Sequence, residues 1–204
     1  MKTITEIKPQ VKNAKRVSIY LDGAYYCGLD LITTLTYRLK VGDKISEEKL
    51  IEIQYEAEYR SALDYALTVV SKAIKTEKQI KDKLILKGYL EEIVLKVIDK
   101  LKEYGYVNDE DYAKRYVSSV KATKGAKLIK LELIKKGIKG DALDNAVNDI
   151  EGQVESAKAI AEKYLKNKEK DKTNLLKCYK YLLSKGFSYD DAKSAIEGFG
   201  DIEN

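Results

Sequence analysis

The sequence predicts a mainly α-helical protein, with three tandem three-helix repeats in an elongated array behind a small N-terminal antiparallel β element. Two observations support this prediction. Apolar and polar residues alternate over 16–29, whereas from about Tyr59 onward apolar residues recur at steps of three and four, the period of a helix. In the helical part, Lys-Gly pairs recur at Gly88, Gly137 and Gly186, two equal steps of 49 residues, which is typical of an internal repeat.

The N-terminal β element is predicted from an alternating segment and a turn. Within "RVSIYLDGAYYCGL" (16–29), the Asp-Gly pair at 22–23 supplies the positive φ angles that a tight hairpin turn needs. Together with "TITEI" (3–7), this segment predicts an antiparallel sheet of two or three strands. A short helix from Asp30 and a second helix beginning at Ser46 are expected to follow.

Each Lys-Gly pair is interpreted as the end of one helix and the beginning of a short turn. A Leu lies four residues before every one of these glycines, and Tyr, Ile or Phe follows directly. Glycine adopts the left-handed conformation that ends many helices, and the preceding Lys suits the negative end of the helix dipole. We therefore assign a structural role, helix capping, to Gly88, Gly137 and Gly186.

Helix start signals place further helices in each repeat. Thr76 with Gln79 resembles a capping box, Asn108 precedes an acidic first turn, and Ser188 is followed by two Asp residues. An additional helix is expected ahead of each Gly-ended helix, over 61–73, 109–122 and 153–165. The predicted domains are an N-terminal extension over 1–58 and three repeats over 59–104, 105–151 and 152–204.

The composition argues against an enzyme. The chain has no His, which removes the commonest general base and transition-metal ligand and closes the Ser-His-Asp and zinc-water routes. The segment "KATKGAK" (121–127) lacks the first Gly of a phosphate-binding loop and the hydroxyl after its Lys. The acidic pairs at 91–92 and 190–191 suit the first turns of helices. We expect no catalytic residue, no metal site and no cofactor.

Two further features indicate a cytoplasmic protein without membrane association. No run approaches eighteen apolar residues, and "MKTITEIKPQ" (1–10) lacks the apolar core of a signal peptide. Cys27 and Cys178 lie far apart and match no metal-binding spacing, so we expect both to be reduced packing residues.

Basic charge is concentrated in the middle repeat. Residues 114–139 hold nine basic side chains and only Glu132 as an acid, a net charge of +8, whereas 141–204 has a net charge of −3. This concentration indicates a partner that is a polyanion or an acidic protein surface, although a merely solvated lysine face is the alternative. The candidate contact residues are Lys114, Arg115, Lys121, Lys124, Lys127, Lys130, Lys135 and Lys136.

The helical period also predicts which side chains in this segment are buried. The lysines are expected to point away from an apolar face formed by Leu128, Ile129, Leu131 and Ile134. Tyrosines accompany the charge and are able in principle to stack on single-stranded bases. The four-residue step from Tyr112 to Tyr116 instead favours core or half-buried positions for these side chains. The tyrosines are Tyr104, Tyr106, Tyr112 and Tyr116.

The segment "EYGYVNDEDYAKRYVSSVKATKGAKLIKLELIKKGI" (103–138) resembles the RecX family, bacterial regulators of the RecA recombinase. The family pattern is Gly-Tyr-Leu-Asp-Asp, then Phe-Ala and Tyr-Val, a basic Gly-containing segment, and Glu-Leu with Lys-Gly-Ile. The matching residues here are Gly105-Tyr106-Val107-Asn108-Asp109, Tyr112-Ala113, Tyr116-Val117, 121–127, Glu132-Leu133 and Lys136-Gly137-Ile138. The resemblance covers about 55–200, and the β element is similar to extensions of some members. Positions usually rich in Arg are Lys or neutral here, as at Ser71-Lys72-Ala73 and Lys127-Leu128-Ile129, and a Lys keeps the charge while losing the bidentate contacts of Arg.

The resemblance implies a protein that binds along the groove of a RecA–single-stranded-DNA filament and lowers its ATP hydrolysis and strand exchange. Such a protein modulates homologous recombination, DNA repair and the SOS response, contacts single-stranded DNA through the filament, and is expected to be a monomer. The residues leave two alternatives open. One is a stand-alone DNA-binding protein with helix-turn-helix-like units, and the other is a helical-repeat adaptor for an acidic protein.

Overall fold

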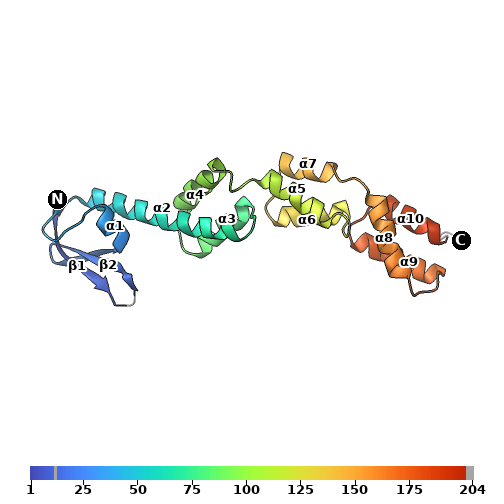
Figure 1. The fold of residues 1–204 in the computed structure, drawn as a ribbon, viewed down its shortest axis with the longest axis horizontal. Coiled ribbons are helices and arrows are strands. Elements are labelled where there is room, and N and C mark those ends of the chain that lie inside the picture. Colours follow the sequence, from blue (N-terminus) through green and yellow to red (C-terminus); the bar gives the residue numbers. More distant parts are fainter. Residues whose placement is uncertain (12, 201–204) are drawn as a thin grey trace. The chain divides into compact units, whose positions relative to one another are not determined.

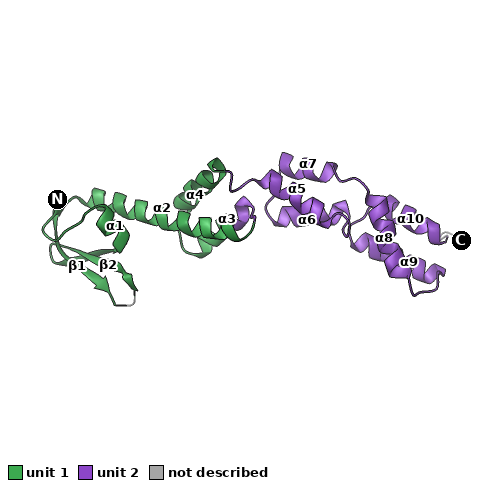
Figure 2. Cartoon of the chain, viewed as in Figure 1, with its two compact units in different colours: residues 1–73, 81–104 green, residues 74–80, 105–204 purple. Residues whose placement is uncertain are grey.

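The protein is described by a computed structural model, which covers residues 1–11 and 13–200. The chain divides into two compact units (Figure 2). Unit 1 comprises Met1–Ala73 and Lys81–Tyr104, and unit 2 comprises Ile74–Ile80 and Gly105–Asn204.

Helices dominate both units, and a small antiparallel sheet lies at the N-terminus, as predicted (Figure 1). No helix in the described ranges is both long enough and apolar enough to cross a membrane. The elements are β1 (Lys2–Gln10), β2 (Asn13–Leu21), β3 (Ala24–Asp30), α1 (Leu31–Thr36), β4 (Lys44–Ile45), α2 (Glu47–Lys72), α3 (Glu77–Leu86), α4 (Glu91–Glu103), α5 (Asp109–Val120), α6 (Ala126–Lys135), α7 (Asp141–Asn148), α8 (Gln153–Leu165), α9 (Lys172–Ser184), α10 (Tyr189–Ile196) and the 3₁₀ helix η1 (Glu197–Phe199).

The sheet of unit 1 has the strand order β3-β2-β1-β4. The predicted hairpin turn is confirmed, because Asp22 and Gly23 have φ angles of 46° and 86°. The fourth strand was not predicted, since β4 has only two residues and forms through pairing with Lys2 and Thr3. Apolar side chains that alternate along the strands, including Ile4, pack with the beginning of α2 to form the core of the sheet.

Helix α2 is longer than the sequence pattern predicts. Ser46 caps it as predicted, because the Ser46 hydroxyl accepts a hydrogen bond from the Lys49 backbone N–H. The helix then continues for 26 residues, so the predicted domain boundary between residues 58 and 59 lies inside it. The physical reason is that the segment contains neither Gly nor Pro to end the helix. Its first part buries Leu50 and Ile53 in the core of the sheet, and its later part packs on α4.

Two hydrophobic clusters lie in the described part of unit 2. One joins α5, α6 and α7 around buried side chains such as Ile129 and Leu133. The other joins α8, α9 and α10, and its members include Leu182, Phe187 and Cys178. Cys178 and its counterpart Cys27 in unit 1 are both buried free thiols, as predicted. Burial raises the pKa of Cys178 above the ordinary thiol value and that of Cys27 to about 11, which keeps both in the neutral form.

The three Lys-Gly turns have the same backbone conformation but different surroundings. Gly88, Gly137 and Gly186 follow α3, α6 and α9 with φ angles of 89°, 95° and 90°. A Cβ atom on Gly88 would meet nothing within 4 Å. A Cβ on Gly137 would come 2.4 Å from the Cβ of Lys78, and one on Gly186 would come 2.4 Å from both the Cβ and the backbone nitrogen of Leu128. The second and third turns are therefore packing contacts as well as helix ends.

The third Lys-Gly turn caps the first turn of α6. The backbone N–H of Gly125 donates to the Lys185 carbonyl at 2.9 Å, and that of Lys127 donates to the Gly186 carbonyl at 3.1 Å. Between them, the N–H of Ala126 donates at 2.8 Å to the side-chain oxygen of Gln153, the first residue of α8. N–H groups at a helix start have no partner within their own helix. The following repeat supplies these partners.

The second Lys-Gly turn makes an equivalent contact with the first turn of α3, within unit 2. The Thr76 hydroxyl donates to the Lys136 carbonyl at 2.7 Å. The N–H of Glu77 donates at 2.9 Å to the side chain of Asp109, the first residue of α5. In both contacts, the start of one helix is held by a Lys-Gly turn and by the first residue of another helix. We call this arrangement a capping junction. The second and third Lys-Gly turns, 49 residues apart, therefore also make the same kind of packing contact.

Candidate partner-binding site

Two of the predicted contact residues lie on α5 in exposed, local ion pairs. Lys114 contacts Glu110 at 2.7 Å and Arg115 contacts Asp111 at 2.8 Å, both one helical turn apart. Such exposed pairs contribute only about 0.3–0.5 kcal/mol each. The two basic side chains can therefore exchange these acids for a partner at little cost.

Two further candidates belong to a half-buried network instead. The Lys124 ammonium donates to both carboxylate oxygens of Glu132, at 2.6 and 2.8 Å, and the Tyr116 hydroxyl donates to the same carboxylate. The Lys136 ammonium lies 5.0 Å from the centre of the Tyr116 ring, which stacks on the Tyr112 ring. Lys124 and Lys136 therefore stabilise the junction of α5 with α6 and are poor candidates for partner contacts.

The network shifts the pKa values of its members. Burial alone would raise the pKa of the Glu132 carboxyl, but hydrogen bonds from Lys124 and Tyr116 outweigh burial and hold it below its usual value. The hydrogen bond to Glu132 raises the pKa of Lys124. Burial, together with the same carboxylate, raises the pKa of Tyr116. At neutral pH the network therefore holds a charged Lys–Glu pair beside a neutral phenol.

Glu132→Gln is expected to destabilise the protein by about 1–3 kcal/mol at pH 7, because it removes a charge-assisted hydrogen-bonded pair that is largely shielded from solvent. A carboxyl whose pKa is lowered by folding stabilises the folded state above its unfolded pKa, about 4.3, and this contribution disappears as the pH falls through the folded pKa. Urea unfolding of both proteins at pH 7 and pH 3.5 measures the difference, which should shrink at the lower pH.

Glu110→Gln provides the matched control, because it removes the exposed ion pair with Lys114. Its expected cost is about 0.5 kcal/mol or less. Equal losses for Glu132→Gln at the two pH values would contradict the role assigned to the Glu132 carboxylate.

The remaining four candidates are exposed side chains on α6 or close to its ends. Lys130 lies 3.5 Å from Asp144, and the Lys127 ammonium lies 5.0 Å from the centre of the Tyr189 ring. Once Glu110, Asp111 and Asp144 are counted with the basic segment, its net charge falls from +8 to +5. These four exposed lysines are Lys121, Lys127, Lys130 and Lys135.

The outer face of α6 is apolar as well as basic, which corrects the predicted pattern. Ile129 is buried and Leu128 packs on Gly186, as an inward face requires. Leu131 and Ile134, however, are 56% and 48% exposed. Their spacing places them beside the exposed lysines of the same helix. We call Lys127, Lys130, Leu131, Ile134 and Lys135 the α6 face.

The tyrosines near this site divide into two pairs. Tyr112 and Tyr116 are half-buried and stacked, which confirms the packing role expected from their spacing. Tyr104 and Tyr106 are more than half exposed. Tyr112 and Tyr116 also line a shallow hollow of about 200 Å³ with Arg115. No group of three or more His, Cys, Asp or Glu side chains in the described ranges is arranged to hold a metal ion.

Three family models match the chain. The model described as the regulatory protein RecX N-terminal domain matches residues 2–46, which hold the sheet and α1. The first and third three-helix domains of RecX match residues 62–101 and 151–196. These matches fall on the N-terminal sheet and on two of the helical repeats.

Similar proteins extend the match over nearly the whole chain. The regulatory protein RecX of Clostridium perfringens (strain SM101) is 37% identical over 202 residues, covering 96% of this chain and 95% of the relative. The regulatory protein RecX of Bacillus subtilis (strain 168) is 34% identical over 203 residues, covering 97% of this chain and 77% of the relative.

Solved structures agree with the sequence matches. The crystal structure of a regulatory protein RecX superposes with a TM-score of 0.69 at 28% identity and covers 97% of this chain and 100% of the other. The crystal structure of RecX from Lactobacillus salivarius gives a TM-score of 0.63 at 32% identity over 70% of this chain and 96% of the other. Sequence and structure lead to one conclusion: this chain belongs to the RecX family of regulatory proteins.

Proposed function

We propose that the protein binds the RecA–single-stranded-DNA filament through the α6 face and lowers the filament's ATP hydrolysis and strand exchange. Family membership over nearly the whole chain is the observation that supports this function most strongly. Regulation by binding needs no catalytic residue or cofactor in the regulator itself. A regulator of this kind would act in the cytoplasm, as a monomer, on recombination and DNA repair.

The α6 face has the chemistry that such a partner requires. Exposed lysines attract phosphates by displacing bound counterions, and they do so without reading sequence. Exposed Leu131 and Ile134 have no matching group on a phosphate backbone but fit an apolar protein surface. A filament made of protein and DNA offers both kinds of contact side by side. A mixed apolar and basic face therefore favours the filament over naked DNA.

The function is tested by titrating the protein into RecA assembled on single-stranded DNA. We expect ATP hydrolysis to fall at or below one protein per RecA protomer, and strand exchange to fall with it. If both activities stay at their starting values throughout the titration, the proposed function is wrong.

The second candidate function, stand-alone DNA binding, is favoured by the exposed lysines alone. The double change Leu131→Ser with Ile134→Ser separates the two candidates, because it leaves every charge in place. We expect filament binding to weaken by about tenfold or more, the loss expected when two apolar side chains no longer bury against protein. Binding to naked single-stranded DNA should stay the same. Fluorescence anisotropy with labelled DNA measures both affinities.

Leu176→Ser is the control for this pair, because Leu176 is also partly exposed but lies on α9. It should leave both affinities unchanged. Equal losses on filament and naked DNA for the α6 variant would instead favour the stand-alone DNA-binding function.

A further inference from the structure

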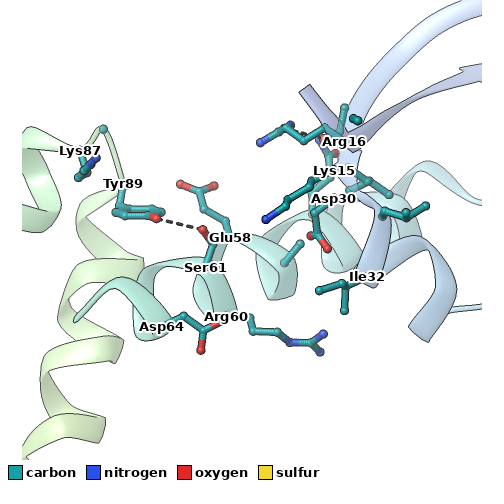
Figure 3. A pocket seen from close by; sticks show the side chains of 17 residues that line it. Lys15, Arg16, Asp30, Ile32, Glu58, Arg60, Ser61, Asp64, Lys87 and Tyr89 are labelled. Carbon is teal, nitrogen blue, oxygen red and sulfur yellow. Dashed lines mark hydrogen bonds between the residues drawn. The ribbon is translucent and has the colours of Figure 1, made fainter. Parts of the chain in front are cut away.

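Unit 1 contains a cavity of about 740 Å³ beside the first Lys-Gly turn. One wall is formed by the β2 and β3 residues around Arg16 and by the beginning of α1, and the other by the middle of α2 and the turn at Lys87 and Gly88 (Figure 3). This volume is within the range of about 300–1,000 Å³ found for ligand pockets. The site already described, on α6, shares no residue with it.

The cavity repeats the parts of a capping junction. In the junction at α6, helix N–H groups are held by the carbonyls of Lys185 and Gly186 and by the side chain of Gln153. The equivalent turn residues Lys87 and Gly88 line the cavity, and neither of their carbonyls accepts a hydrogen bond from any residue in the described part of the chain. Gln54 and Glu58, from the middle of α2, line the same space, and the Glu58 carboxylate accepts a hydrogen bond from the backbone N–H of Leu90, two residues after the turn.

The first turn differs from the other two in being open. Gly88 is exposed, and a Cβ added to it would meet no atom within 4 Å. Gly186, by contrast, is buried against Leu128. Among the described residues, none comes as close to Gly88 as Leu128 comes to Gly186, although the φ angle of Gly88, 89°, matches the 90° of Gly186.

We propose that this cavity receives the first turn of a helix from the protein component of the filament, an inference that rests on the proposed function. A helix start presents as many as four unpartnered N–H donors, and the turn carbonyls of Lys87 and Gly88 are acceptors. A phosphate group is itself an acceptor and gains no hydrogen bond from these carbonyls, and the acids in the lining largely offset its bases; the acids are Asp30, Glu58 and Asp64, and the bases are Lys15, Arg16, Arg60 and Lys87. The rim carries Lys15, Arg16 and Lys87, which suit the acidic side chains common in the first turn of helices.

The turn is held in position before any partner arrives. The hydroxyl groups of Ser61 and Tyr89 are hydrogen-bonded at 3.0 Å, which ties the turn to α2 (Figure 3). The Lys87 ammonium lies 5.2 Å from the centre of the Tyr65 ring on the same helix. A preformed set of acceptors lowers the entropic cost of binding.

The test is the substitution Gly88→Asn, which puts a side chain into the space that the partner helix would occupy. Asn tolerates the left-handed conformation that ends α3, so the helix end is retained. We expect filament binding to weaken by about tenfold while binding to naked single-stranded DNA is unchanged. Gly105→Asn is the matched control, because Gly105 also has a positive φ, 72°, and open surroundings. It should leave both affinities unchanged.

The possible results separate this inference from the proposed function. If the wild-type protein binds the filament and Gly88→Asn binds it equally well, the inference is wrong and the function stands. If the wild-type protein does not bind the filament, both are wrong. Equal losses on filament and naked DNA would show that the occupant is nucleic acid. A photoreactive amino acid at position 86, where Leu86 is 88% exposed, should crosslink to RecA close to the start of a helix; crosslinks to DNA alone would contradict the inference.

Discussion

Gly125→Ala is expected to destabilise unit 2 by about 3 kcal/mol, the upper part of the range for overpacking a closely packed site. A Cβ at this position would lie 2.1 Å from the Phe187 backbone nitrogen and 2.3 Å from the Gly186 carbonyl oxygen. Backbone atoms cannot rotate away as a side chain can, so the capping junction has to open. The φ angle of Gly125 is −78°, which Ala adopts without strain. The loss of stability in this variant therefore measures the effect of the packing clash alone.

Alanine at the three Lys-Gly turns gives a graded comparison, because all three glycines have nearly the same φ angle. Gly88→Ala should cost only the left-handed strain of about 1 kcal/mol. Gly137→Ala should cost more because it meets the Lys78 side chain, and Gly186→Ala the most because it meets the backbone of Leu128. Thermal and urea unfolding measure the series. Equal losses at the three positions would show that the capping junctions do not stabilise the fold.

Reversing three exposed charges on the α6 face is expected to have the largest effect on function. The triple change Lys127→Glu, Lys130→Glu and Lys135→Glu should weaken filament binding by about 100-fold at 0.1 M salt, because phosphate contacts are lost and like charges approach. The salt dependence should fall as well, by roughly 0.7 in the logarithmic slope for each lost contact with single-stranded DNA. Fluorescence anisotropy across a salt series gives both quantities.

A matched triple change on α8 controls for net charge. Lys158 and Lys163 on α8 and Lys166 at its C-terminal cap are also exposed, and replacing each with Glu alters the total charge by the same amount. This variant should bind nearly as well as the wild-type protein. If both triple variants lose affinity equally, attraction depends on the overall charge and the α6 face is not the contact site.

Local patterns were sufficient to predict most of the secondary structure. The Asp-Gly pair at 22–23 predicted the hairpin turn, and the reciprocal hydrogen bonds of Thr76 with Gln79 confirm that capping box. The helix start predicted at Ser188 is likewise confirmed, and there the structure forms a capping box with Asp191. These features depend on residues at most three positions apart in the sequence, so the sequence alone specifies them.

Local sequence patterns do not predict the capping junctions, because the residues that form each junction are far apart in the sequence. The Thr76 hydroxyl contacts the carbonyl of Lys136, sixty residues later, and Gly125 contacts Lys185 at the same separation. The equal steps between the Lys-Gly pairs indicate that the repeats are equivalent, but they do not indicate that the second and third turns each pack on another helix start. Gly125 was the available signal, because a glycine at a helix start where neither φ nor flexibility requires one indicates a close approach.

The charge of the middle repeat was overestimated for a related reason. The pairs of Glu110 with Lys114 and of Asp111 with Arg115 have a four-residue spacing that was visible in the sequence. The contact between Lys130 and Asp144 depends on how α6 packs against α7, and no spacing rule predicts it. Tertiary packing thus narrows eight candidate residues to an exposed subset around α6.

The most direct test of the account compares three partners in one binding measurement: RecA–single-stranded-DNA filaments, naked single-stranded DNA and RecA alone. Labelled protein is titrated with each at several salt concentrations. A contact through the α6 face predicts tight binding to the filament and much weaker binding to the other two partners, and it predicts that this difference is lost when the charges of Lys127, Lys130 and Lys135 are reversed. Equal affinity for filament and naked DNA, or filament binding that the reversed α6 charges leave intact, would contradict it.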